Sequence, residues 1–323
     1  MRILPSILAA IACLVASSIA RAAVPSPDDR PTVTCSVGMV ADIARGIAGD
    51  HAVIETLVGP GIDPHLHKPT RSDIARIMKA DLVVAVGLHL EGRMDTAFTR
   101  AEKSGRRVIR VGDALPTDRI VRASKDEADP HAWMDPRTWT FVVDPIAEAL
   151  GEVDPPNAAA YRTNAAKVKA ALADLDRWSA ERLATVPSDS RVLVTAHDAF
   201  EYFGRRYGFE VVGIQGISTE SEAGVRDIER IVDLLVDRRV PAVFIESTVP
   251  PRHVQALVAG ARARGHEVKV GGELFSDAMG KPGTHEGTYE GMIDHNVTTI
   301  TRALGGDVPA RGREGRLAGG PDS

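Results

Sequence analysis

NAAAYRTNAAKVKAALADLDRWSAERLATV, residues 157–186, contains neither proline nor glycine and lies between Pro155-Pro156 and Pro187. Its apolar side chains recur at spacings of four and three, which predicts an amphipathic helix. They are Tyr161, Ala165, Val168, Leu172, Leu175 and Trp178. One helix over this stretch would be about 45 Å long at 1.5 Å per residue. We expect a single helix that joins two lobes and restrains their motion more than a flexible linker would. Two shorter helices are the alternative.

Before this helix, strand-like apolar runs alternate with helical patterns. Strands are predicted at residues 32–37, 53–58, 81–86 and 107–111, and helices at residues 40–48 and 72–79. The run DLVVAV at 81–86 is continuous, as in strands that are buried on both sheet faces. Thr70 and Asp73 form a capping-box pattern before the second helix. Such an alternation of strands and helices favours a parallel sheet.

The same alternation returns after the long helix. Strands are predicted at residues 191–195, 210–213, 242–245 and 267–270, and helices at residues 225–235 and 253–264. The predicted fold class is therefore α/β, with two lobes that are each a parallel sheet flanked by helices. The N-terminal lobe covers residues 31–154, the connecting helix 155–187 and the C-terminal lobe 188–304. The tail at 305–323 is rich in glycine, proline and charged residues, and we predict that it is disordered.

The first 22 residues have the organisation of a signal peptide. Arg2 precedes an apolar run from Ile3 to Ile19, and Ala20-Arg21-Ala22 is a small-x-small cleavage site. The apolar run is too short, and too interrupted by serines, to favour a membrane span. We therefore expect export to the periplasm with cleavage near Ala22. A lipid anchor at Cys13 is not expected, because Ala10 stands where lipoprotein signals usually have leucine.

Charge and cysteine content exclude two classes of protein. Removing residues 1–22 lowers the number of Lys and Arg from 39 to 37 against 44 Asp and Glu, so the mature net charge is −7. A mildly acidic chain without clustered basic residues is not expected to bind nucleic acid. Cys35 is then the single cysteine, so the mature chain forms no internal disulfide.

The tripeptide Asp-Pro-His occurs twice, at residues 63–65 and 129–131. Proline fixes its own φ and lacks an N–H, so each copy predicts a stiff loop that presents an imidazole, His65 or His131. The other half of the chain offers His197 at the carboxyl end of a strand and Asp277 in a loop after the last strand. Open α/β sheets bind ligands at the carboxyl ends of their strands. We therefore predict one metal site in the cleft between the lobes, with His65, His131, His197 and Asp277 as ligands.

Each of these residues alone has an ordinary explanation. A single loop histidine is usually a surface residue, and Asp277 alone would usually cap a helix. His67 could share a face with His65 and is a weaker candidate ligand. Glu246, at a strand end, is a candidate for orienting a ligand, or equally for bonding nearby backbone. The other histidines are not expected to bind the ion: His51, His253 and His266 as surface residues, and His89, His285 and His295 nearer the cleft.

Three neutral imidazoles and one carboxylate suit a particular group of ions. Without thiolates or further carboxylates, the set favours one Zn²⁺, Mn²⁺ or Fe²⁺ over Ca²⁺, Mg²⁺ or Cu⁺. The main alternative is an exported metal-dependent hydrolase, but a catalytic site keeps one position open for water, and this set fills four. The sequence contains no HExxH, GxGxxG or P-loop motif, which argues against a zinc protease and a nucleotide-binding protein.

Six motifs in order resemble the cluster A-I metal-binding receptors, the TroA/PsaA/ZnuA family. The resemblance covers residues 32–303 and is closest to the TroA-like pattern, because some manganese-binding members have glutamate where this chain has His197. Zinc-dedicated members often carry a long His- and acid-rich loop before the second DPH motif, whereas residues 111–129 are short and contain no histidine. The motifs are GIDPHLHKPT, GLHLEGRMD, DPHAWMDP, TAHDAFEYFGRRYGFEV, FIESTVPPRH and GELFSDAMG.

The resemblance implies a receptor of an ABC transporter and not an enzyme. Such a receptor has two α/β lobes, a connecting helix and the metal between the lobes, and His65, His131, His197 and Asp277 match the family's ligands. It would bind one divalent ion (manganese, zinc or iron) outside the membrane as a monomer. It would then dock on a membrane permease that a cytoplasmic ATPase powers. An adhesin with the same fold is a further alternative.

Overall fold

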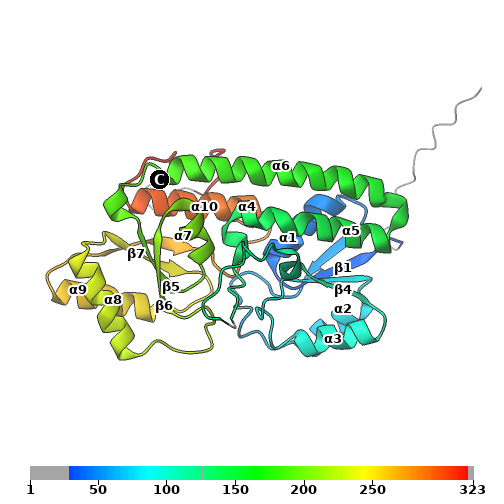
Figure 1. The fold of residues 1–323 in the computed structure, drawn as a ribbon, viewed down its shortest axis with the longest axis horizontal. Helices are drawn as coiled ribbons and strands as arrows, with labels where there is room; N and C mark the ends of the chain where they lie inside the picture. Colours follow the sequence, from blue (N-terminus) through cyan, green and yellow to red (C-terminus); the bar gives the residue numbers. More distant parts are fainter. Residues whose placement is uncertain (1–28, 126, 319–323) are drawn as a thin grey trace, which may run out of the picture.

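The computed structural model describes residues 29–125 and 127–318. They form two lobes that lie side by side beneath one long helix (Figure 1). The predicted signal peptide and Cys13 lie outside the described residues. Within those residues, no helix has both the length and the apolar character that crossing a bilayer requires.

The N-terminal lobe is built on one parallel four-stranded sheet of order β2-β1-β3-β4. One of its two inner strands, β3, is fully buried, as the continuous apolar run predicts. The helices α1 and α5 lie on the side of the sheet that faces the long helix, and α2 and α3 lie on the other side (Figure 1). The strands are β1 Thr32–Cys35, β2 Val53–Thr56, β3 Leu82–Ala85 and β4 Arg107–Arg110, and the helices are α1 Gly38–Ala48, α2 Arg71–Lys79, α3 Asp95–Lys103 and α5 Val143–Val153.

A capping box begins α2, as the sequence predicts. The hydroxyl of Thr70 accepts a hydrogen bond from the backbone N–H of Asp73, and the Asp73 carboxylate accepts one from the N–H of Thr70. The start of α2 is therefore fixed, and with it the end of the loop that carries the first DPH motif.

The C-terminal lobe contains two parallel two-stranded sheets, β5-β6 and β7-β8, with β5 beside β7. This differs in detail from the single sheet that the sequence predicts. Where β5 meets β7, the N–H of His197 donates to the side chain of Glu246. The helices α8 and α9 lie on one side and α7 and α10 on the other (Figure 1). The strands are β5 Val192–His197, β6 Glu210–Gln215, β7 Ala242–Glu246 and β8 Lys269–Leu274, and the helices are α7 Glu201–Tyr207, α8 Val225–Asp237, α9 Arg252–Ala263 and α10 Tyr289–Ala303.

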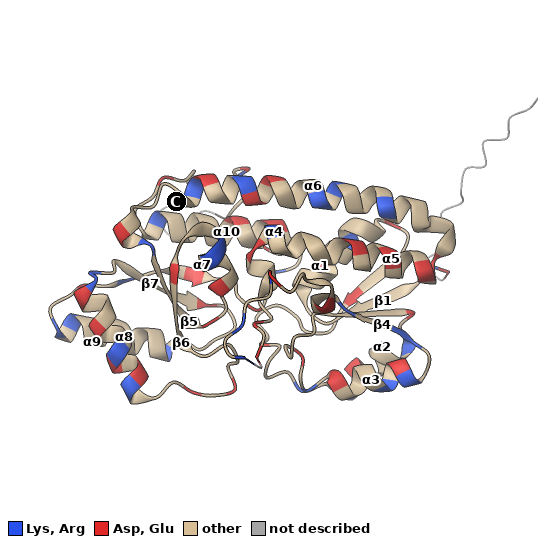
Figure 2. Ribbon diagram, in the orientation of Figure 1, with Lys and Arg blue, Asp and Glu red and all other residues tan. Residues whose placement is uncertain are grey.

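The connecting segment is one helix, α6, Ala158–Leu183, of 26 residues. It packs on α1, α5 and the short helix α4 (Pro136–Trp139) of the first lobe and on α10 of the second. The predicted stripe is the packed face: four of its six members are buried, and Val168 and Trp178 are partly buried against the same core. Acidic and basic residues are interspersed along the helix (Figure 2). The predicted two-lobed α/β fold with one long connecting helix is confirmed.

One hydrophobic cluster runs through both lobes. It includes the first sheet, α1, α5 and α6, and it continues through α7 and α10 of the second lobe. A smaller cluster lies between the second-lobe strands and the helices α8 and α9. The lobes therefore share a core on the α6 side of the molecule, which leaves their opposite side for the cleft.

The tail differs from the disorder that its composition predicts. As far as Ala318 it packs back on α10, where the backbone N–H of Arg313 donates to buried Asp294 at 2.9 Å and the guanidinium of Arg313 pairs with Glu290. Leu317 is buried. Composition failed here because a buried carboxylate supplies a partner that the tail's own sequence does not show. Residues 319–323 lie outside the described residues.

Candidate metal centre

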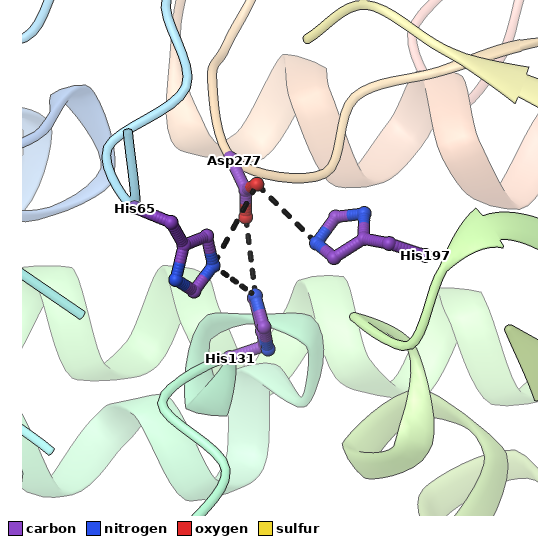
Figure 3. A group of neighbouring side chains, drawn as sticks. All are labelled: His65, His131, His197 and Asp277. Atoms are coloured by element: carbon purple, nitrogen blue, oxygen red, sulfur yellow. Dashed lines mark hydrogen bonds and ion pairs between the residues drawn. The ribbon is translucent and has the colours of Figure 1, made fainter. Parts of the chain in front are cut away.

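The four predicted ligands meet between the lobes (Figure 3). His65 lies in the loop that follows β2, and His131 immediately precedes a short 3-10 helix, Ala132–Met134. His197 is the last residue of β5, and Asp277 lies three residues beyond β8. All four side chains are buried, and His131 and His197 have no exposed surface. Two candidate donors therefore come from each lobe.

Their candidate ligand atoms all lie within 4.8 Å of one another. Nε2 of His131 is 3.2 Å from Oδ1 of Asp277, and Nε2 of His197 is 3.3 Å from Oδ2 of the same carboxylate. Nε2 of His65 is 3.3 Å from Nε2 of His131 and 3.9 Å from Asp277 Oδ2. Imidazole nitrogens and a carboxylate oxygen converging in this way form a donor set for a divalent transition metal.

Three atoms of this cluster are buried without a hydrogen-bond partner among the described residues. They are Nε2 of His197 and both carboxylate oxygens of Asp277. A buried polar atom that lacks a partner costs free energy, and a buried carboxylate costs more than a neutral group. A cation between the four side chains would satisfy all three atoms, so the donor set fits a metal ion.

The carboxylate of Asp129 orients the imidazole of His131. Oδ1 of Asp129 lies 2.7 Å from Nδ1 of His131 and also accepts the backbone N–H of that residue at 2.9 Å. The hydrogen bond to Nδ1 leaves Nε2 free to face the other donors. Asp129 belongs to the DPH motif itself, and the sequence reasoning used it only as the residue before proline. A carboxylate two positions before a candidate ligand was the signal for this role.

Glu246 orients His197 in the same way, by accepting hydrogen bonds from its ring and its backbone. Its Oε2 lies 2.5 Å from Nδ1 of His197, and its Oε1 accepts the backbone N–H of His197 at 2.9 Å. Both alternatives that the sequence left open are therefore present at once, since Glu246 bonds a ring nitrogen and the neighbouring backbone. With Asp129, Glu246 and Asp277, three buried carboxylates surround three imidazoles, and a divalent ion would offset most of that negative charge.

The environment shifts the pKa values of the imidazoles in opposite directions. Burial lowers the pKa of His65 to about 4, so this ring is neutral at pH 7. Burial also opposes the charged form of His131, but the Asp129 and Asp277 carboxylates outweigh it and raise its pKa to about 9. For His197, Glu246 and Asp277 outweigh burial and raise the pKa well above its usual value. Protons therefore compete with metal at His131 and His197.

Asp277 is the carboxylate that stays ionised. Burial alone would raise its pKa, but His197, His131 and His65 hold it well below its usual value. No helix begins at Asp277, so it is not the helix cap that a single aspartate would most often be.

The other histidines lie elsewhere. His67 turns away to Asp73, with Nε2 3.2 Å from its Oδ2, and so supports the start of α2. His89 lines a cavity beside His65. The remaining rings contact protein groups: His51 lies edge-on to Tyr161, His253 pairs with Glu222, His266 bonds Val240 O, His285 bonds Asp294, and His295 bonds Glu273 O.

Comparison with known proteins gives a family for this arrangement. Residues 33–303 match the family model described as "ZnuA: Zinc-uptake complex component A periplasmic". The chain belongs to this family. The manganese-binding lipoprotein MntA of Bacillus subtilis is 45% identical over 280 residues, covering 86% of this chain and 91% of MntA. The zinc-binding protein TroA of Treponema pallidum is 42% identical over 277 residues, covering 86% and 90%.

The solved structures agree with the sequence relatives. The structure of the periplasmic zinc-binding protein TroA from Treponema pallidum superposes with a TM-score of 0.83 at 41% identity, over 85% of this chain and 99% of TroA.

A further sequence relative, the iron-binding protein YfeA of Yersinia pestis, is 30% identical over 273 residues, 84% of this chain and 86% of YfeA. The predictions of this family, of a metal-binding receptor and of a protein that is not an enzyme are confirmed.

One expectation from the N-terminal sequence is contradicted. We expected no lipid anchor at Cys13, yet MntA and two streptococcal relatives are named as lipoproteins. Ala10, three positions before Cys13, is therefore compatible with a signal whose main requirements are an apolar run and small residues. Export itself is supported by the family's periplasmic description.

Proposed function

We propose that this chain captures one divalent transition-metal ion outside the cytoplasmic membrane through His65, His131, His197 and Asp277. The observation that supports the assignment is the convergence of four candidate donor atoms, two from each lobe, within 4.8 Å of one another. Because the donors belong to both lobes, the ion would clamp the lobes together. Binding would then strengthen the contact between the lobes, and release would need only a local loosening of it.

The proposed recipient is the membrane permease of an ABC transporter, powered by a cytoplasmic ATPase. The family's description as an uptake component and the name of the streptococcal relative SloC, a metal ABC transporter substrate-binding lipoprotein, support this partner. The receptor would act as a monomer outside the cytoplasmic membrane.

The donor set supports manganese, zinc or iron as the cargo. Relatives at 45%, 42% and 30% identity are named for manganese, zinc and iron respectively, so the name of a relative does not select one. Intrinsic affinity rises from Mn²⁺ to Zn²⁺, and geometry and availability decide the rest. Competition among the three ions on the purified protein, together with growth rescue of a metal-transport mutant, identifies the physiological cargo.

The ligand assignment predicts a large effect of His131→Ala. The change removes one donor and leaves the buried Asp129 carboxylate without its imidazole partner. Removing a group that merely orients a ligand costs 10–100-fold in affinity, so loss of a ligand should cost at least about 100-fold. The wild-type protein should bind about one ion per chain by metal analysis after dialysis.

His253→Ala is the matched control, because His253 lies outside the cluster and pairs with Glu222 near the surface. It should bind metal like the wild type. Undiminished affinity in His131→Ala would overturn the ligand assignment.

A further inference from the structure

Residues 216–224, between β6 and α8, belong to the second lobe and contact the first. We call this segment the cleft loop. Oγ1 of Thr219 in the cleft loop donates a hydrogen bond to Oδ2 of Asp63, at 2.5 Å. Thr219 is buried, with 8% of its surface exposed. The bond joins residues 156 positions apart in the sequence and links the first DPH motif to the other lobe.

The same carboxylate also positions His65. Oδ1 of Asp63 accepts the backbone N–H of His65 at 2.8 Å. One oxygen of Asp63 therefore holds the residue that carries the imidazole, and the other oxygen receives the hydroxyl of Thr219. A movement of the cleft loop away from the first lobe would remove the Thr219 hydrogen bond from this carboxylate and leave only bonds within its own loop.

The two DPH motifs differ at this point. In both, the aspartate accepts the backbone N–H of the histidine two positions later. The carboxylate of Asp129 binds the ring of its own His131. The carboxylate of Asp63 instead accepts the hydroxyl of Thr219 from across the cleft. The side chain that anchors His131 thus bonds only within its own loop, whereas the side chain that anchors His65 also bonds the other lobe.

A second contact supports the cleft loop at its exposed side. The guanidinium of Arg93 pairs with Glu220 at 3.0 Å, and both side chains are substantially exposed. Exposed ion pairs contribute little and are screened by salt. The buried Thr219 hydroxyl is therefore the stronger of the two connections.

The cleft loop also forms a wall of the approach to the site. A cavity of about 280 Å³ adjoins His65, and the cleft loop contributes Ile217, Ser218 and Glu220 to its lining. The first lobe contributes Pro130, next to His131, and His89. An ion that leaves past His65 through this cavity therefore passes the cleft loop.

We propose that Thr219 is a positioning residue that, through Asp63, holds His65 in its ligating place and slows the release of the ion. This inference rests on the proposed function, because it presumes that His65 is a ligand. Loss of the hydroxyl bond should leave all four ligands in the chain and the stoichiometry unchanged. It should shorten the residence time of the ion by about three- to tenfold, the equivalent of one ordinary hydrogen bond.

The test measures the release of Zn²⁺ from the loaded protein into an excess of a chromogenic chelator by stopped flow. Thr219→Val removes the hydroxyl at nearly constant volume, and Thr219→Ser keeps it. Thr163→Val, on the exposed face of α6, is the matched control. Release should be faster in Thr219→Val and close to wild type in Thr219→Ser and Thr163→Val. Thermal unfolding of the metal-free proteins shows whether a lower general stability accounts for the change.

The outcomes separate this inference from the proposed function. If the wild-type protein binds no ion, the proposed function fails and the inference with it. If the wild type binds one ion but Thr219→Val releases it at the wild-type rate, the inference alone is overturned. Equally fast release from Thr219→Ser and Thr219→Val would also overturn it, because the hydroxyl would then have no part in retention.

Discussion

At the scale of single residues, carboxylates hold two of the four proposed ligands in place. Asp129 and Glu246 each bind a ring nitrogen and the backbone N–H of the same histidine. Each therefore fixes both the position and the ring orientation of its ligand. Such partners also make the imidazole a better donor. An ion at the proposed site would then meet two rings that need no reorientation.

This arrangement predicts the effect of Glu246→Gln. The amide keeps the shape of the side chain but loses the charge that stabilises the polarised imidazole of His197, and its NH₂ group cannot accept the backbone N–H. Metal affinity should fall by about 10–100-fold, as for other partners of metal-bound histidines. Chelator competition measures it.

Glu181→Gln, on the exposed face of α6, is the control and should leave affinity unchanged. Wild-type affinity in Glu246→Gln would show that Glu246 supports the packing of β5 against β7 and does not orient His197 for metal binding.

Much of the site, but not all of its support, can be predicted from residues. The four candidate ligands lie in proline-fixed loops or near strand ends, and both features can be predicted from the neighbouring residues. They are His65, His131, His197 and Asp277. The Thr219–Asp63 bond is different, because a threonine in an irregular loop looks the same whether or not it meets a carboxylate 156 positions away. Long-range partners of this kind depend on how the lobes sit together.

At the scale of elements, α6 links the lobes by burying one stripe of side chains. It packs on α1, α4 and α5 of the first lobe and on α10 of the second, and the side-chain amide of Asn164 donates to Ile47 O at 3.1 Å. A helix of 26 residues anchored at this many places acts as a shared support for both lobes.

Leu175→Ala should therefore destabilise the whole protein. Leu175 has 1% of its surface exposed, and truncating a buried leucine leaves a cavity that costs about 2–5 kcal/mol. Urea unfolding measures the loss, and one metal ion per chain should still bind to the folded variant. Lys167→Ala, on the exposed face, should change stability by less than about 0.5 kcal/mol. A loss confined to one lobe, seen as two separate transitions, would contradict the role of α6 as a shared support.

Elements were predicted best where burial and periodicity agree. The strands of the first lobe follow their apolar runs closely. Strand β8 extends to Leu274, four residues beyond its predicted end. The prediction ended at residue 270 because the two glycines that follow, Gly271 and Gly272, are typical of a loop. Gly271 has no room for a side chain between Ala303 and Phe244, so the glycine there serves close packing. Helix α10 was not predicted, because polar residues on its buried face obscure the apolar stripe; they include Asp294, Asn296, Thr298 and Thr301.

At the scale of the whole molecule, buried polar contacts join the lobes beside the metal centre. The indole N–H of Trp133 donates to Ser276 O at 2.9 Å, next to Asp277. The hydroxyl of Tyr289 donates to Trp133 O at 2.7 Å, and that of Tyr202 donates to Asp129 O at 3.1 Å. Together with the shared hydrophobic cluster, these bonds oppose a wide hinge motion, because opening would leave several buried groups without partners.

Metal removal should therefore change the overall shape little. We expect the radius of gyration from X-ray scattering, about 20 Å for a chain of this length, to differ by less than about 1 Å between the chelator-treated and the loaded protein.

The structural change on metal removal should be local instead. Hydrogen exchange should rise on metal removal in the cleft loop, residues 216–224, and in the first DPH loop, because their shared bond at Asp63 is an interlobe contact next to the proposed ligand His65. The strands β1 and β3 serve as internal controls and should keep their protection. A rise in exchange along α6, or a change in radius of several ångströms, would mean that the lobes swing apart as rigid bodies and that α6 bends to allow it.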